Sequence, residues 1–167
     1  MRQERFTELA HEAIAASVEL VRQYKHSQWD VEHLLLALLQ QERGLVGDIL
    51  RELKIDIEAV KQQVEVALGK TPRVAYEVTQ IYPTPRINRV VDMAKAEAER
   101  MKDEFISTEH LLIAIVAEKG EASEILRQFG IDQEKVYRAL QDIRGGHRVT
   151  DARAESKYRS LEKYGRD

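Results

Sequence analysis

The sequence has no cysteine, and only three prolines and eight glycines interrupt its 167 residues. A chain without cysteine forms neither disulfides nor thiolate metal sites, which favours a cytoplasmic protein. No apolar run approaches the ~20 residues that a membrane-spanning helix needs, and no signal peptide precedes Phe6, so we expect no membrane partner. With 33% charged and 43% hydrophobic residues, the composition is typical of a helical globular protein.

Negative charge is concentrated in the body of the chain. The net charge is −3, but the residues from Arg144 to the end carry +3, which leaves −6 on residues 1–143. Binding to nucleic acid depends on basic side chains that neutralise phosphates. We therefore expect no nucleic-acid partner.

One helical pattern occurs twice in the sequence. The run from Glu32 to Leu39 returns 77 positions later, from Glu109 to Val116, whereas Ile55-Asp56 returns 76 positions later as Ile131-Asp132. One residue has therefore been lost between these two points. Two copies of a helical unit normally stack on a shared core, and the seam between them is a natural place for a groove.

Helix starts are marked in the same way in both copies. Thr7 and Thr84 suit the N-cap position of the first helix, and Pro85 suits the first helical turn. Asp30 and Ser107 suit the N-cap of the second helix, each with an apolar residue before it and a leucine at the fourth helical position. Third helices are expected at about 46–53 and 121–128, and fourth helices at about 57–68 and 133–143.

This pattern predicts an all-α fold of two tandem four-helix repeats, packed as a pseudo-two-fold dimer. The first repeat covers residues 1–68, a connecting loop covers 69–83, and the second repeat covers 84–143. Residues 144–167 are predicted to form a C-terminal linker tail. We expect its polar part, from Thr150 onward, to leave the globule.

Two motifs that would indicate chemistry are incomplete. Gly69-Lys70-Thr71 is similar to the end of a phosphate-binding loop, but the first glycine of that motif would fall on Val64. His11-Glu12 opens like a zinc-protease motif, but Ala15 occupies the last ligand position. We therefore predict no catalytic residue, no metal site and no cofactor in this chain.

The repeat places two glutamates at equivalent positions. Glu32 and Glu109 lie in the first turn of their helices, where a carboxylate stabilises the helix dipole by ~0.3–1 kcal/mol. That role is sufficient to explain them. The alternative is a pair of carboxylates beside the groove, which would suit a guanidinium or peptide N–H donors.

Val91 and Met93 differ in their relation to the predicted core. They lie about 200° apart around a helix, so both cannot face the core. Val91 follows the apolar stripe that includes Ile87 and Ala94, whereas Met93 does not. An exposed apolar residue near the seam would help to form a patch for unfolded segments.

The paired Glu-His-Leu-Leu helices and paired Ile-Asp caps resemble the double Clp repeat, the N-terminal domain of the Clp family of ATP-driven protein-unfolding chaperones. The resemblance covers about Arg5 to Ile143. Arg144-Gly145-Gly146, followed by the run from Leu161 to Asp167, is similar to the linker and the entry to the first ATPase module in the ClpB branch, the disaggregases. The ATPase modules, which would bind ATP and magnesium, are absent from this sequence.

The resemblance implies a domain that catches unfolded or aggregated polypeptide and passes it to a homohexameric ATPase. The chain itself would then be a binding domain rather than an enzyme. In ClpB-type domains, the positions that match Thr7, Asp103 and Glu109 form a polar set linked to substrate engagement. The positions that match Val91 and Met93 lie in an adjacent apolar groove.

Two departures from the ClpB pattern affect that groove. Glu97 and His110 occupy positions that are leucine in related domains. We therefore expect the apolar patch to be smaller or shifted.

A ClpC-like role is the nearest alternative. In that branch, the positions that match Glu32 and Glu109 are implied to hold phosphorylated arginine, and the same domain docks adaptor proteins for a protease. A carboxylate suits the guanidinium, and helix N-terminal N–H groups suit the phosphate. A small enzyme that uses the Glu-His pairs as acid and base is a weaker alternative, because adjacent helical residues point about 100° apart.

Overall fold

Eight helices form the two predicted repeats within residues 5–155, the part of the chain that the computed structural model describes. Repeat 1 contains α1 (Glu8–Gln23), α2 (Val31–Gln40), α3 (Leu45–Glu52) and α4 (Ile57–Lys70). Repeat 2 contains α5 (Pro85–Arg100), α6 (Thr108–Ala117), α7 (Glu121–Gln128) and α8 (Gln133–Arg144). The all-α class is confirmed, and none of these helices is long and apolar enough to cross a membrane.

Equivalent helices begin at matching positions. α1 and α5 have 16 residues each and start 77 positions apart, and α2 and α6, with 10 residues each, do the same. α3 and α7 have 8 residues each and start 76 positions apart. The residue that the second copy lacks is therefore missing from the connection between α6 and α7.

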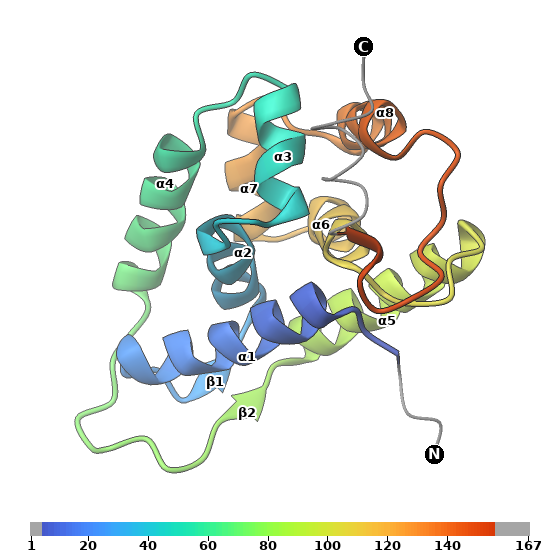
Figure 1. Ribbon diagram of the computed structural model, residues 1–167. Helices are drawn as coiled ribbons and strands as arrows, with labels where there is room; N and C mark the ends of the chain where they lie inside the picture. Colours follow the sequence, from blue (N-terminus) through green and yellow to red (C-terminus); the bar gives the residue numbers. More distant parts are fainter. Residues whose placement is uncertain (1–4, 156–167) are drawn as a thin grey trace.

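α2 and α6 occupy the centre of the molecule (Figure 1). Most residues of both helices are buried, and each helix contacts elements of the other repeat as well as its own. α1 packs mainly on α2 and α5 mainly on α6, while α3 meets α8 and α4 meets α7 across the seam. Side chains therefore fill the seam around the two central helices.

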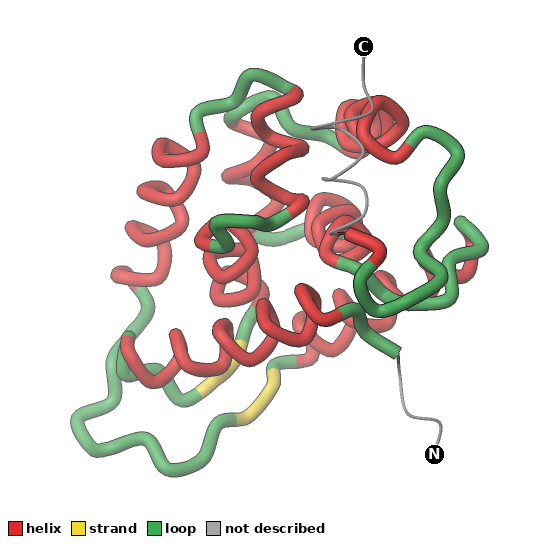
Figure 2. The backbone as a smooth tube through the Cα atoms, viewed as in Figure 1, coloured by secondary structure: helices red, strands yellow, loops and turns green. Residues whose placement is uncertain are grey.

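Short parallel contacts also join the repeats. β1 (Gln28–Trp29) pairs with β2 (Tyr82–Pro83), within the segment predicted as a loop; both strands are yellow in Figure 2. Phe6 forms an isolated parallel bridge with Ile106. This bridge is equivalent to the pairing of Pro83 with Trp29, because Phe6 lies 77 positions before Pro83 and Ile106 lies 77 positions after Trp29. The segment before the first helix of each repeat thus pairs with the segment before the central helix of the other.

The chain does not leave the globule at Thr150, so that prediction is wrong for residues 150–155. From α8 the chain runs back across repeat 2 toward α1 and α6 (Figure 1). Val149, Ala154 and Glu155 are only 0%, 2% and 1% exposed. We refer to residues 147–155 as the strap. Residues 156–167, which carry the ClpB-like ending, lie outside the described residues.

Candidate functional site

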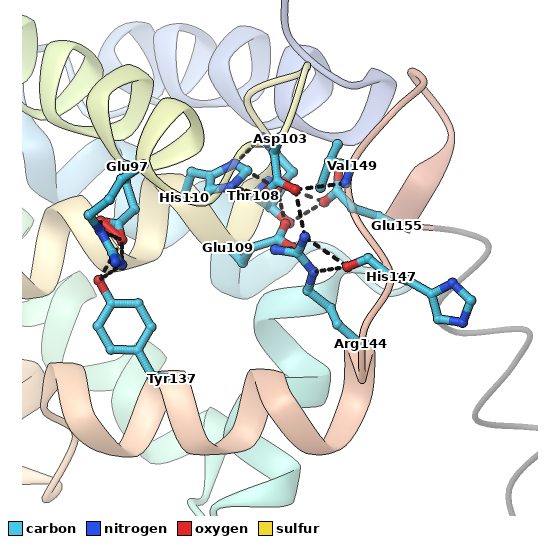
Figure 3. Close-up of polar contacts among 12 residues, drawn as sticks. Glu97, Asp103, Thr108, Glu109, His110, Tyr137, Arg144, His147, Val149 and Glu155 are labelled. Carbon is cyan, nitrogen blue, oxygen red and sulfur yellow. Dashed lines mark hydrogen bonds and ion pairs between the residues drawn. The ribbon is translucent and has the colours of Figure 1, made fainter.

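The predicted polar set belongs to one buried network beneath the strap. Thr7 precedes α1, Asp103 follows α5, and Glu109 lies in the first turn of α6. Figure 3 shows how Asp103 and Glu109 lie among the residues of the strap and the end of α8. Thr7 and Glu109 are 0% exposed, and Asp103 is 8% exposed. A large ligand therefore does not reach these side chains while the strap is in place.

Arg144 holds the two acids of the set. Its guanidinium donates to Asp103 Oδ1 at 2.7 Å and to Glu109 Oε2 at 3.4 Å. Burial opposes the charge of Asp103, but donors from His110, Arg144 and the Val149 amide outweigh it and lower the pKa of Asp103 to about 2. Asp103 is thus a buried carboxylate that remains ionised, and both of its oxygens accept hydrogen bonds.

Glu155 brings a third carboxylate to the network from the strap. It accepts hydrogen bonds from the hydroxyls of Thr7 and Thr108, and from the Thr108 amide at 3.2 Å. Burial, followed by the nearby Glu109 carboxylate, raises the pKa of Glu155 to about 7. No local pattern in the sequence points to Arg144, Glu155 or Thr108, because only the course of the strap brings them together.

A histidine closes the N-terminus of each central helix. His33 Nδ1 accepts the backbone amide of Asp30 at 3.0 Å, and His110 Nδ1 accepts that of Ser107 at 2.8 Å. The third helical residue of a capping box is commonly Glu or Gln, and the imidazole nitrogen has the same acceptor role here. The polar residue at position 110 is therefore part of the helix cap.

The second ring nitrogen of each histidine has a different partner. His110 Nε2 lies 2.7 Å from Asp103 Oδ2, whereas His33 Nε2 lies 2.9 Å from His26 Nδ1. His26 and Asp103 are 77 positions apart, so one repeat has a His–His pair where the other has a His–Asp pair. Burial and then the neighbouring His26 lower the pKa of His33 to about 4.

Glu32 lies at the equivalent point of repeat 1 and is held by Arg86. The Arg86 guanidinium is 3.0 Å from Glu32 Oε2, 2.9 Å from Glu118 Oε1 and 3.3 Å from Asp30 Oδ2. Burial raises the pKa of Glu32, although Arg86 acts in the opposite direction. Like Glu109, Glu32 therefore has an arginine of this chain as its partner.

Val91 and Met93 are both partly exposed on α5. Val90, rather than Val91, completes the buried stripe with Ile87 and Ala94, so the prediction that Val91 follows that stripe is wrong. Met93 packs against the core from its half-buried position. The two residues remain candidates for an apolar contact surface.

A polar cluster surrounds Glu97 on the same helix. Glu97 accepts a hydrogen bond from the Tyr137 hydroxyl at 2.5 Å and pairs with Arg100. Tyr137 comes from α8, so the cluster ties the end of α5 to the last helix of repeat 2. Glu97 occupies one of the two positions where the resemblance leads us to expect leucine.

The paired four-helix units, with a histidine-capped helix at the centre of each, define a tandem helical repeat domain. The chain belongs to the family of Clp repeat (R) N-terminal domains, whose model matches residues 5–129. It is 39% identical over 163 residues to the chaperone protein ClpB 1 of Synechocystis sp., which covers 98% of this chain and 18% of that protein. The chain thus spans about a fifth of the length of the curated relatives that it matches. The resemblance to the ClpB N-terminal domain is confirmed.

Solved structures share the fold. The Hsp104 N-terminal domain from Candida albicans matches with a TM-score of 0.82 and 21% identity, over 91% of this chain and 99% of that chain. A complex of the ClpV N-domain with a VipB peptide matches with a TM-score of 0.60 and 16% identity, over 84% of this chain and 91% of that chain. At these identities the likeness shows the fold alone.

The buried histidine pair predicts a pH dependence of stability. The pKa of His33 is about 4 in the folded chain and 6.5 ordinarily, so the unfolded chain takes up the proton more readily. We expect this group to lower the free energy of unfolding as the pH falls from 6.5 toward 4. His33→Gln keeps a side-chain acceptor for the Asp30 amide and should flatten this part of the profile, measured by urea unfolding at several pH values. An unchanged slope in the variant would contradict the assignment.

Gly120 leaves room for Arg86 beside Glu118. A Cβ atom on Gly120 would lie 2.2 Å from an Arg86 nitrogen and 2.7 Å from a Glu118 oxygen. We expect Gly120→Ala to displace the guanidinium and lower the free energy of unfolding by ~1–3 kcal/mol in urea titrations. Gly69→Ala is the control, because nothing lies within 4 Å of its added Cβ. It should raise the free energy of unfolding by ~0.5–1 kcal/mol, and a loss of similar size in both variants would argue against the steric cause.

Proposed function

We propose that this chain is the substrate-binding N-terminal domain of a ClpB-type protein disaggregase in the cytoplasm. It binds unfolded or aggregated polypeptide weakly and passes it to a hexameric ATPase, where ATP and magnesium act. The similarity to a ClpB chaperone over 98% of the chain is the observation that carries this proposal. The ClpV N-domain complex supports it, because a domain of the same fold there holds a peptide.

The residues suggest how such binding would work. Val91 and Met93 offer partly exposed apolar side chains, which suit the apolar residues of an unfolded segment. Asp103 and Glu109 would offer carboxylates for peptide N–H groups once the residues that bury them are displaced. Because a motor must pull the segment away, we expect roughly micromolar or weaker affinity, at or above ~−8 kcal/mol.

The arginine partners argue against the phosphoarginine alternative. A bound phosphoarginine would have to displace Arg86 from Glu32, where it lies at 3.0 Å, or Arg144 from Glu109, where it lies at 3.4 Å. No carboxylate of this pair is therefore ready to receive a second guanidinium.

Titration of the labelled chain with β-casein, an unfolded polypeptide, tests the proposal. We expect amide shifts around Val91 and Met93 with β-casein, and none at the starts of α2 and α6 with free phosphoarginine. Val91→Ser should weaken casein binding by roughly 3–10-fold, since an apolar contact of partial burial is lost.

Val66→Ser is the matched control for that substitution. Val66 lies on α4 of repeat 1, whereas the candidate residues lie on α5 of repeat 2, and it is 49% exposed. It should leave casein affinity unchanged. Equal weakening in the two variants would show nonspecific apolar adhesion, and phosphoarginine shifts at Glu32 and Glu109 would favour the ClpC-like role.

A further inference from the structure

The start of α2 shows what the contact between the repeats requires. The Asp30 carboxylate accepts a hydrogen bond from the Thr84 hydroxyl at 2.8 Å and from the Val31 amide at 2.8 Å. Thr84 is the N-cap of α5, so this single carboxylate satisfies a donor from each repeat. The arrangement is complete within the helical repeats themselves.

At the equivalent position of repeat 2 the chain has Ser107, which carries no carboxylate. Glu155 provides it from the strap, and accepts hydrogen bonds from the Thr7 hydroxyl and the Thr108 amide. These two donors lie 77 positions from the two that Asp30 accepts. Glu155 therefore has the role in repeat 2 that Asp30 has in repeat 1.

The arginine is replaced in the same way. Arg86 of α5 holds Glu32, but the equivalent position of α1 is Leu9. Glu109 is held instead by Arg144, the last residue of α8. The second site thus takes both its arginine and its carboxylate from residues 144–155.

The strap is held by backbone hydrogen bonds at two points, by the Val149 amide on Asp103, and by burial of its apolar side chains. The Glu8 amide donates to the Ala152 carbonyl at 2.9 Å, and the Glu104 amide donates to the Val149 carbonyl at 2.7 Å. A hollow of about 310 Å³ lies beside this contact, lined by residues of the strap and of α1, among them Ala152 and Glu8. Residues 147–150 of the strap lie in no helix or strand, and such a segment opens at a lower free energy than a packed helix.

We propose that the strap is a detachable cover: Glu155 plugs the carboxylate site that the second repeat leaves open, and its release uncovers Thr7, Asp103 and Glu109 to polypeptide. This inference rests on the proposed function, because the uncovered residues are those proposed to engage substrate. Closed, the strap shields them completely. Open, it withdraws Val149 and Ala154 from the hydrophobic core and leaves the eight helices in place.

The charge around Glu155 sets the direction of a pH effect. Its carboxylate faces Glu109 of α6, with Arg144 of α8 on the other side of Glu109, while Arg153 pairs with Glu8 of α1 at 3.2 Å near the surface. The pKa of Glu155 is about 7 when docked and 4.5 ordinarily, so the docked strap holds this proton more tightly. Docking is therefore strongest below pH 4.5 and weakens as the pH rises to about 7.

Amide hydrogen exchange of the full 167-residue chain at neutral pH tests the cover directly. Glu155→Ala removes the plug, and Val149→Asp opens the strap by a second route, since Val149 is 0% exposed. We expect both to speed exchange of the strap amides and of the Thr108 amide by ~10-fold or more. Protection within α2 should persist, which shows that the repeats stay folded.

Two further variants separate charge from surface effects. Glu155→Gln keeps the acceptor without the charge and should exchange as slowly as the parent chain or more slowly at pH 8. Glu65→Ala removes an exposed glutamate of α4 and should change nothing. Unchanged strap exchange in both releasing variants would overturn the proposal.

Casein affinity measured on the same variants tests whether the strap covers the binding site. We expect Glu155→Ala and Val149→Asp to bind β-casein at least ~3-fold more tightly than the parent, because a larger fraction is open. An opened strap with unchanged affinity, in a parent that binds casein, would refute the covering role. If no form binds casein, the proposed function and the covering role both fail, while the exchange data still decide whether Glu155 holds the strap.

Discussion

The structure depends on burying the N-termini of two helices at the centre of the molecule. The first turns of α2 and α6 carry amide groups without intrahelical partners, and burial denies them water. At each start, a histidine of the helix accepts the N-cap amide and a carboxylate accepts the first helical amide, while a backbone contact joins the start to the other repeat. The amides of Thr7 and Thr84 make that last contact, donating to the carbonyls of Ile106 and Trp29 at 3.0 Å each.

This requirement accounts for the charges around the two helix starts. A carboxylate taken out of water needs a cation or several donors, and each of the two sites combines both. In repeat 1 the charged partners lie on α2, α5 and the turn before α7. In repeat 2 they lie at the end of α8 and in the strap, which makes that site depend on a segment outside the repeated unit.

The structural role of the acidic residues differs between the two repeats. For Glu32, the helix dipole and the Arg86 partner account for the side chain without any ligand. For Asp103 and Glu109, Arg144 at the end of α8 is a partner from within the helical repeats, and the strap adds the Val149 amide as a donor to Asp103.

Local patterns in the sequence determined the repeat, the helix starts and the helical class, because caps, staples and 3.6-residue periodicity act within a few positions of one another. Asp30 and Ser107 are recognisable N-caps for that reason. Only the tertiary structure decided that Val90 is buried and Val91 is not. Adjacent residues on a helix point in different directions, and the rotation of the docked helix about its axis selects which of them faces the core. The tertiary structure alone decided the pairing of Glu155 with Thr7 as well, because these residues are 148 positions apart and no local pattern links them. The polar composition after Thr150 indicates solvent exposure. Hydrogen-bond donors from distant segments nevertheless satisfy Glu155, so this end of the strap is buried.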